Sequence, residues 1–244
     1  MEILSKQNEK IKNLRKLQNK KERKIQGVFV VETEKLIQEA VSCGYEIEEL
    51  YFTCDVAPFE AKHKYKISED VMKSVSSLSS ASKVLAVVRY INKPPGKEKF
   101  LVLENIQDPS NVGAIIRTAF GAGFNTVYCI DSADAYECKA LRSSMGAIFH
   151  INLINSSIEE IKQISGVELV CASMEGENIY KQKHFGNNVG VVIGNEGNGV
   201  SENLKSLCSR VVSIPMQQGL ESLNASISAG LIMYAISYNL KEGK

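Results

Sequence analysis

The segment Asn92-Lys-Pro-Pro-Gly-Lys-Glu-Lys99 limits the fold more than any other feature of the 244-residue chain. Two prolines and a glycine among charged residues are typical of a stiff, exposed linker. On both sides of it, short apolar runs alternate with helical patterns, which indicates two compact α/β units. We therefore predict a first unit over residues 1–92, a linker over 93–99 and a second unit over 100–244.

The first unit begins with a predicted helix over residues 4–24, because an apolar stripe recurs there at helical spacing among cations. The stripe consists of Leu4, Ile11, Leu14 and Leu17. Further strands are predicted at 28–31, 47–53, 65–67 and 84–89, and helices at 33–43, at 56–62 and from 68. A serine-rich loop is predicted at 74–82.

The second unit contains several continuous apolar runs, as expected for strands of a mostly parallel sheet that is covered on both faces. Strands are predicted at 100–103, 126–130, 148–154, 168–172, 189–193 and 211–215. Helices are predicted at 112–121, 157–164, 202–207 and 223–240.

Charge is distributed unevenly, although the net charge of the chain is only +1. Residues 1–24 hold nine Lys and Arg against three Glu, a local charge of +6, which leaves −5 for the rest. A basic head on an acidic body is typical of a protein that meets a polyanion. A solvated basic helix without a partner gives the same pattern, so both interpretations stay open.

Composition excludes several classes of protein. The six cysteines form no C-x-x-C pair and none lies beside a histidine at metal spacing, so we predict free thiols and no metal site. His63, His150 and His184 have no paired nucleophile, which disfavours a hydrolase of the triad type, and the sequence assigns them no role. No run reaches the ~18 to 20 apolar residues of a membrane span, and the charged N-terminus does not resemble a secretion signal. We therefore predict a cytoplasmic protein.

The first of three chemically informative segments is Asn111-Val-Gly-Ala-Ile-Ile-Arg-Thr-Ala-Phe-Gly-Ala-Gly123, preceded by Asp108-Pro-Ser. Pro109 and Ser110 are good helix-entry residues, so a strand should feed a turn and then a helix N-terminus. Such a terminus presents unpaired N–H groups to an anion or a carbonyl. Arg117 lies among apolar residues of this helix, where an arginine can also simply extend to solvent.

The second segment is Val191-Val-Ile-Gly-Asn-Glu-Gly-Asn-Gly-Val-Ser-Glu-Asn-Leu204. A buried strand ends in three glycines spaced G-x-x-G-x-G, with Glu196 between them. The spacing is neither that of a phosphate-binding Walker loop nor that of a dinucleotide-binding fold. Glycines at a strand end permit close backbone approach to a ligand, but a tight turn before a helix would also explain them.

The third segment runs from Ser213 to Ile236. Ile214 and Pro215 end a strand, and Glu221, Ser222 and Asn224 surround the entry to a helix that is rich in small residues. Small residues allow a helix to pack closely. An ordinary core helix with Ser222 as its N-cap is the simpler explanation of this segment alone.

In this order, the Asn/Arg segment, the Gly-Asn-Glu-Gly segment and the Ser-Leu-Asn segment together closely resemble the three motifs of the SpoU (TrmH) branch of the SPOUT RNA methyltransferases. The segment from Lys139 to Ala147 looks like a further family segment, and the resemblance covers residues 100–244. Residues 1–92 resemble the small substrate-binding domain, similar to ribosomal protein L30e, that many members carry. The segment Ser79–Val87 lacks the glycine often seen there, which leaves the substrate open.

The resemblance implies a SPOUT-type α/β catalytic domain whose C-terminal segment threads a deep trefoil knot, beside a smaller L30e-like α/β domain. It implies S-adenosylmethionine as cofactor, bound at Gly194, Ile214 and Leu223 with Met216 and Ser222 as neighbours. The catalytic residues that it implies are Asn111, Arg117, Glu196 and Asn224. Members are usually homodimers in which the C-terminal helix helps to form the interface.

The implied activity is methylation of a ribose 2′-hydroxyl in structured RNA, with 23S ribosomal RNA favoured. RNA contacts are expected from the basic head and the Lys139–Ala147 segment, namely from Arg15, Lys16, Lys20, Lys21, Arg23 and Arg142. Three alternatives remain: a tRNA methyltransferase, an inactive RNA-binding member of the fold, and an enzyme that uses another nucleotide in a Rossmann-like fold.

Overall fold

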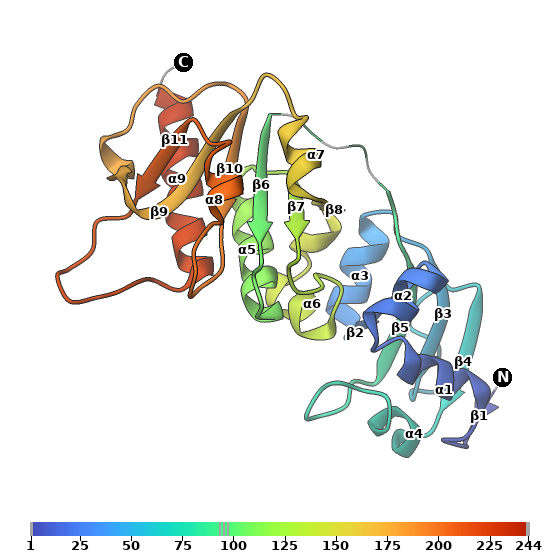
Figure 1. Ribbon diagram of the computed structural model, residues 1–244. Coiled ribbons are helices and arrows are strands. Elements are labelled where there is room, and N and C mark those ends of the chain that lie inside the picture. Colours follow the sequence, from blue (N-terminus) through green and yellow to red (C-terminus); the bar gives the residue numbers. More distant parts are fainter. Residues whose placement is uncertain (1, 93, 95, 97, 243–244) are drawn as a thin grey trace.

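The computed structural model describes residues 2–92, 94, 96 and 98–242, and it contains two sheets with their helices (Figure 1). The first sheet has five strands in the order β1-β4-β3-β5-β2, and the second has six in the order β11-β9-β10-β6-β7-β8. The chain leaves the first sheet at Arg89 and enters the second at Lys99. Lys93, Pro95 and Lys97 of the predicted linker lie outside the described residues.

The elements of the first unit are β1 (Glu2–Ile3), α1 (Glu9–Lys16), α2 (Lys20–Gln26), β2 (Val28–Glu32), α3 (Glu34–Ser42), β3 (Ile47–Phe52), β4 (His63–Ile67), α4 (Glu69–Lys73) and β5 (Val84–Arg89). Those of the second are β6 (Lys99–Glu104), α5 (Pro109–Ala122), β7 (Thr126–Ile130), α6 (Cys138–Ser144), η1 (Ala147–Phe149), β8 (Asn152–Asn155), α7 (Ile158–Lys162), β9 (Glu168–Asn178), η2 (Ile179–Lys181), β10 (Val189–Ile193), α8 (Glu202–Lys205), β11 (Arg210–Ser213) and α9 (Ala225–Glu242).

The predicted single helix over residues 4–24 is wrong, because two short helices take its place. The Asn19 side chain accepts a hydrogen bond from the Lys21 N–H and caps α2, which competes with continuation of α1. Leu17 is buried at the break, whereas Leu4, placed in the predicted stripe, is 68% exposed. The buried part of the stripe packs α1 against the first sheet.

Two further predictions are corrected. Residues 56–62 form no helix: Pro58 lacks an N–H, and most side chains there are exposed, so little burial would hold a helix in place. The predicted strand over 148–154 is shortened to β8. Gly146, with φ of +92°, turns the chain into the 3₁₀ helix η1, whose three side chains are buried.

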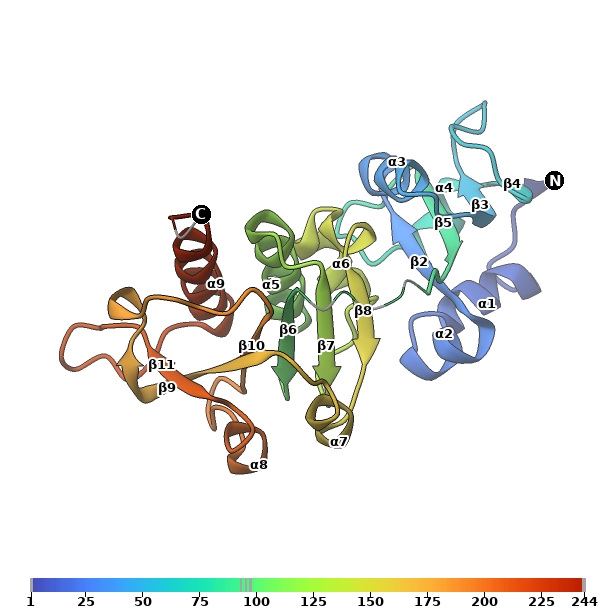
Figure 2. The ribbon, with the colours of Figure 1, turned by 90° about the horizontal axis from the view of Figure 1, so that it is seen from above.

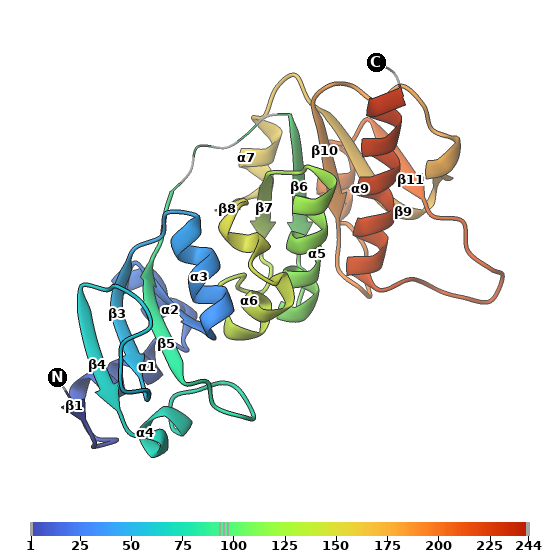
Figure 3. The same cartoon turned by 180° about the vertical axis from the view of Figure 1, so that it is seen from behind.

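All strand pairs of the second sheet are parallel, as the apolar runs predicted. Helices α5, α6 and α9 cover one face, and α7 and α8 cover the other (Figures 2 and 3). β6 and β10 are neighbours, and the chain passes from β6 to β7 on one side of the pair and from β10 to β11 on the other, so the connections that follow these two strands run in opposite directions. Ligands of open parallel sheets bind at such a switch point, outside the carboxyl ends of the strands. Here these are the ends of β6 and β10.

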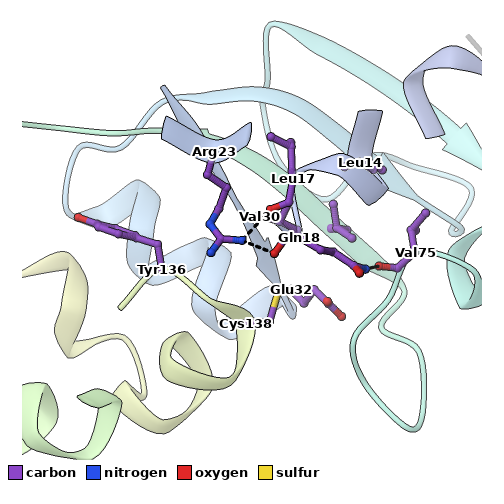
Figure 4. Close-up of a pocket in the computed structure, with 10 residues that line it drawn as sticks. Leu14, Leu17, Gln18, Arg23, Val30, Glu32, Val75, Tyr136 and Cys138 are labelled. Atoms are coloured by element: carbon purple, nitrogen blue, oxygen red, sulfur yellow. Dashed lines mark hydrogen bonds between the residues drawn. The ribbon is translucent and has the colours of Figure 1, made fainter. Parts of the chain in front are cut away.

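The two units pack directly against each other. Arg23, only 3% exposed, donates to the carbonyls of Leu17 and Gln18 at 2.8 Å each (Figure 4). It also forms an ion pair with Asp134 of the second unit. The ring of Phe29 on β2 lies 4.7 Å from that of Tyr136. In the part of the chain that the structure describes, no helix is long and apolar enough to cross a membrane.

Candidate functional site

The N-terminus of α5 lies at the carboxyl end of β6, as the sequence predicted. The Asp108 side chain accepts a hydrogen bond from the Ser110 N–H at 2.9 Å, and Pro109 occupies the first helical position. The Lys139 ammonium binds the same carboxylate at 2.8 Å, and both donors lower the pKa of Asp108. A charged cap therefore fixes the first turn of α5, which carries Asn111.

Three of the predicted catalytic residues form one hydrogen-bonded chain. The Asn111 side-chain amide donates to Glu196 Oε1 at 2.7 Å, and the Asn224 amide donates to Asn111 Oδ1 at 3.1 Å. Asn224 Oδ1 in turn accepts from the Ser226 N–H at 2.9 Å and so caps α9. The N-cap of α9 is therefore Asn224 and not Ser222. These hydrogen bonds join the three motifs, which are far apart in the sequence.

The loop after β10 is tightly closed and hydrogen-bonded, for reasons that the sequence only partly reveals. A Cβ on Gly194 would lie 2.2 Å from the Gly199 carbonyl, so only glycine allows the loop to close. Asn195 accepts from the Gly197 and Asn198 N–H groups and donates to the Asn105 carbonyl at 2.9 Å. These contacts hold the backbone around Glu196.

Glu104 is a supporting residue that sequence reasoning missed. It is 8% exposed at the end of β6, and its two carboxylate oxygens accept from the Ser201 N–H at 2.7 Å and from the Ser201 hydroxyl at 2.6 Å. These bonds tie the end of β6 to the start of α8, across the loop that carries Glu196. The available signal was a carboxylate at the end of the apolar run Phe100–Leu103.

Arg117 lies apart from the network. It is exposed, and it forms no hydrogen bond or ion pair with the residues that the structure describes. Six helical residues separate it from Asn111, which corresponds to about 9 Å along α5 and about 120° around it. Its guanidinium is thus available to an external anion, whereas Asn111, Glu196 and Asn224 bind one another.

The five predicted cofactor positions lie on the loop after β10 and on the segment between β11 and α9. That segment extends from the body as a long loop (Figures 1 and 3). Ile214 and Leu223, near its two ends, are half-buried, as are Gly194 and Met216, and Ser222 is exposed. Ile214 packs against the core of the second unit. The binding role of these residues, and the knot, stay predictions.

The six predicted RNA contacts fall into three groups. Arg23 is withdrawn from the set, because it is buried and its donors are taken by Leu17, Gln18 and Asp134. Lys16 and Lys21 are exposed. The other three have protein partners that leave them partly accessible: Arg15 binds Ser74, Lys20 approaches the Ser132 carbonyl at 3.5 Å, and Arg142 binds Ser77 at 2.8 Å.

Family comparison matches both units. The model of the SpoU rRNA Methylase family matches residues 98–234, and that of the MRM3-like substrate binding domain matches residues 8–86. The chain belongs to the SpoU rRNA methylase family. It is an S-adenosylmethionine-dependent RNA methyltransferase, and the sequence predictions of family, cofactor and enzyme class are confirmed.

Some relatives of this SpoU methyltransferase align over nearly its whole length. The 23S rRNA (guanosine(2553)-2′-O)-methyltransferase RlmP of Bacillus subtilis is 30% identical over 96% of this chain and 98% of its own. A solved RNA 2′-O ribose methyltransferase is 26% identical, with a TM-score of 0.82 over 99% of this chain and all of its own. The SpoU methyltransferase AviRb of Streptomyces viridochromogenes, solved with its cofactor, shares the fold with a TM-score of 0.87, covering 98% of this chain and 100% of that one at 24% identity.

The donor set of the SpoU methyltransferase suits a cofactor without a phosphate chain. The Gly197 and Asn198 N–H groups, which a phosphate-binding loop would leave free, are taken by Asn195, and the loop carries the acidic Glu196. Half-buried Ile214, Met216 and Leu223 offer apolar contact to a flat base. These features fit S-adenosylmethionine and disfavour a polyphosphate nucleotide in a Rossmann-like fold.

Proposed function

We propose that this SpoU methyltransferase methylates a ribose 2′-hydroxyl of 23S ribosomal RNA, working in the cytoplasm as a homodimer. The observation that carries the proposal is the Asn224–Asn111–Glu196 chain, because it gathers three motif residues at the switch point of a parallel sheet. The full-length likeness to RlmP, a 23S rRNA methyltransferase, favours ribosomal RNA over tRNA.

The free guanidinium of Arg117 defines the chemical role that we assign to it. An arginine remains protonated in proteins, so it does not act as the base. We assign it to a phosphate of the RNA and to the negative charge that develops on the ribose oxygen as its proton leaves. Its exposure, and the absence of a carboxylate bound to it among the described residues, support this assignment.

The remaining polar residues orient the reacting groups. When bound, S-adenosylmethionine supplies an electrophilic methyl group, so the chain needs no nucleophile of its own. Asn111 binds one carboxylate oxygen of Glu196, which leaves the other to accept the hydroxyl proton, directly or through water. Asn224 positions Asn111 and caps α9 at the same time.

The surface that we assign to RNA leads from the first unit to the site. Lys20 on α2 lies against the Ser132 carbonyl, and the Ser132 hydroxyl accepts from the Ile106 N–H at 3.0 Å, just after β6. Lys16 and Lys21 on α1 and α2 are exposed, and Arg142 lies on α6. Cations thus extend toward the carboxyl end of β6, where the substrate ribose is needed.

We assign the contact between the two copies of the chain to α9. Ile227, Leu231, Tyr234 and Tyr238 recur every three or four residues on this helix, and all four are exposed. A continuous apolar stripe on one helix face suits a self-complementary contact about a twofold axis.

The substrate is tested by incubating the protein with radiolabelled S-adenosylmethionine and RNA from cells that lack it, with purified 23S rRNA, 16S rRNA and tRNA in parallel. We expect label in 23S rRNA, at one nucleotide that then resists alkaline cleavage on its 3′ side. Label in tRNA alone would mean that tRNA and not 23S rRNA is the substrate. The absence of label in every RNA would favour an inactive RNA-binding member of the fold.

The dimer is tested separately by light scattering on the eluting protein. The double variant Ile227→Glu/Leu231→Glu should elute with the mass of one chain, because two buried carboxylates would face the partner. Val56→Glu, at an exposed apolar residue of the first unit, is the matched control and should keep the mass of two chains. A wild-type mass of one chain would refute the proposed dimer but would not contradict the proposed methylation.

A further inference from the structure

Three ligand-type side chains converge where the two units meet, away from the site described above. Glu39 and Cys43 lie one turn apart on and just after α3, and His150 follows η1 in the second unit. His150 Nε2 is 2.7 Å from Glu39 Oε1 and 3.4 Å from Cys43 Sγ. One carboxylate oxygen, one sulfur and one ring nitrogen lie within 4.8 Å of one another.

Packing that does not involve the ligand atoms holds the His150 ring and the stem of Glu39 in place. The His150 ring stacks on Phe120 of α5, with centroids 4.5 Å apart and planes 17° apart. The stem of Glu39 lies against Gly146, where a Cβ would be 2.8 Å from Glu39 Cγ. The site is therefore built from both units before any ion binds, which lowers the cost of ordering it.

A plain ion pair between His150 and Glu39 explains only part of this arrangement. The Cys43 sulfur lies beside both ring nitrogens, 3.4 Å from Nε2 and 3.7 Å from Nδ1, while Nε2 also meets the Glu39 carboxylate, and the one proton or lone pair of Nε2 makes one strong hydrogen bond. A cation between the three atoms would satisfy all of them. Zn²⁺ binds thiolate, imidazole and carboxylate alike, whereas the hard cations Mg²⁺ and Ca²⁺ take oxygen ligands and do not favour the thiolate or the imidazole.

We propose that Glu39, Cys43 and His150 bind one Zn²⁺ ion, with the fourth position open to solvent. The Cys43 thiol releases its proton to water as the zinc–sulfur bond forms. Sequence spacing did not indicate the site, because its ligands are 107 residues apart between Cys43 and His150. The ion fixes α3, and with it the first unit, to the sheet that carries the SpoU site.

The test uses the full chain, stripped of metal with a chelator and titrated with Zn²⁺ against a chromophoric competitor. We expect one ion per chain. Cys43→Ser and His150→Gln should each weaken binding by more than the roughly 10- to 100-fold that loss of a residue supporting a ligand costs. Cys54→Ser is the matched control, since Cys54 also lies in the first unit and its thiol donates to the Val56 carbonyl.

Co²⁺ in place of Zn²⁺ gives a second readout that a folding defect cannot imitate. The wild-type protein and Cys54→Ser should show the near-ultraviolet charge-transfer band of a cobalt–thiolate bond, and Cys43→Ala should lack it while unfolding at the wild-type temperature in chelator. Absence of stoichiometric Zn²⁺ binding, or affinity that both ligand variants retain, would overturn the proposal. Neither outcome bears on the proposed methylation of RNA, because the three residues lie away from the SpoU site.

Discussion

The junction between the two units and the site at the carboxyl ends of the strands use the same polar chemistry for opposite purposes. At the junction, the guanidinium of Arg23 is buried, and all three of its nitrogens donate to two carbonyls and to Asp134. At the site, Arg117 is exposed and binds no described residue. A cation that is fully paired holds the fold, whereas one left to solvent is available for RNA.

Removing the buried cation should have the largest effect on stability. Arg23→Ala leaves Asp134 and two carbonyls without their partner, and breaking a buried pair from one side costs about 3 to 5 kcal/mol. Urea unfolding should show this loss, and the remaining folded protein should keep its turnover. Lys24→Ala, next along α2 and exposed, is the control and should unfold like the wild type. Equal stability of both variants would mean that the junction does not depend on Arg23.

Removing the exposed cation should show the opposite pattern. Arg117→Ala should lower turnover by roughly 100-fold or more, the scale of one electrostatic donor to a developing charge. Its unfolding midpoint and its cofactor affinity should not change, because Arg117 is exposed and forms no hydrogen bond or ion pair with the described residues. Single-turnover methylation and calorimetry measure the two quantities. A loss of cofactor affinity would contradict the separate roles assigned to Arg117 and to the loops around Gly194 and Leu223.

Gly113 lies on α5, the helix that carries Asn111, at the point where α5 packs closely against α6. A Cβ there would meet the Ala140 carbonyl oxygen at 2.2 Å, so Gly113→Ala should destabilise the fold by about 1 to 3 kcal/mol. Gly121→Ala in the same helix is the matched control, because its Cβ would meet only the Tyr234 hydroxyl at 3.0 Å. Better helix propensity should make that variant neutral or slightly stabilising.

Sequence reasoning was reliable where local chemistry decides the outcome. The Asp108-Pro-Ser entry predicts the start of α5, and the continuous apolar runs predict a parallel sheet, and both are observed. It failed where a distant contact decides. Arg23 belongs to a basic stretch, and its burial depends on Asp134, which is 111 residues further along the chain. The grouping of Asn111 with Glu196 and Asn224 followed from family resemblance and not from their spacing.

The exposed lysines of the first unit should give the smallest effect, and the one that best separates RNA contact from folding. Deleting residues 1–24 would remove Arg23 and the buried face of α1, so point variants are the sharper test. Lys16→Gln/Lys21→Gln should leave the unfolding midpoint unchanged and reduce the log–log dependence of RNA affinity on salt. Each lost phosphate contact should change the slope by about 0.7 to 0.9. Lys162→Gln/Lys183→Gln, at exposed residues of the second unit that precede the amino ends of β9 and β10, is the control, and an equal change of slope there would assign the effect to net charge instead of to a defined surface.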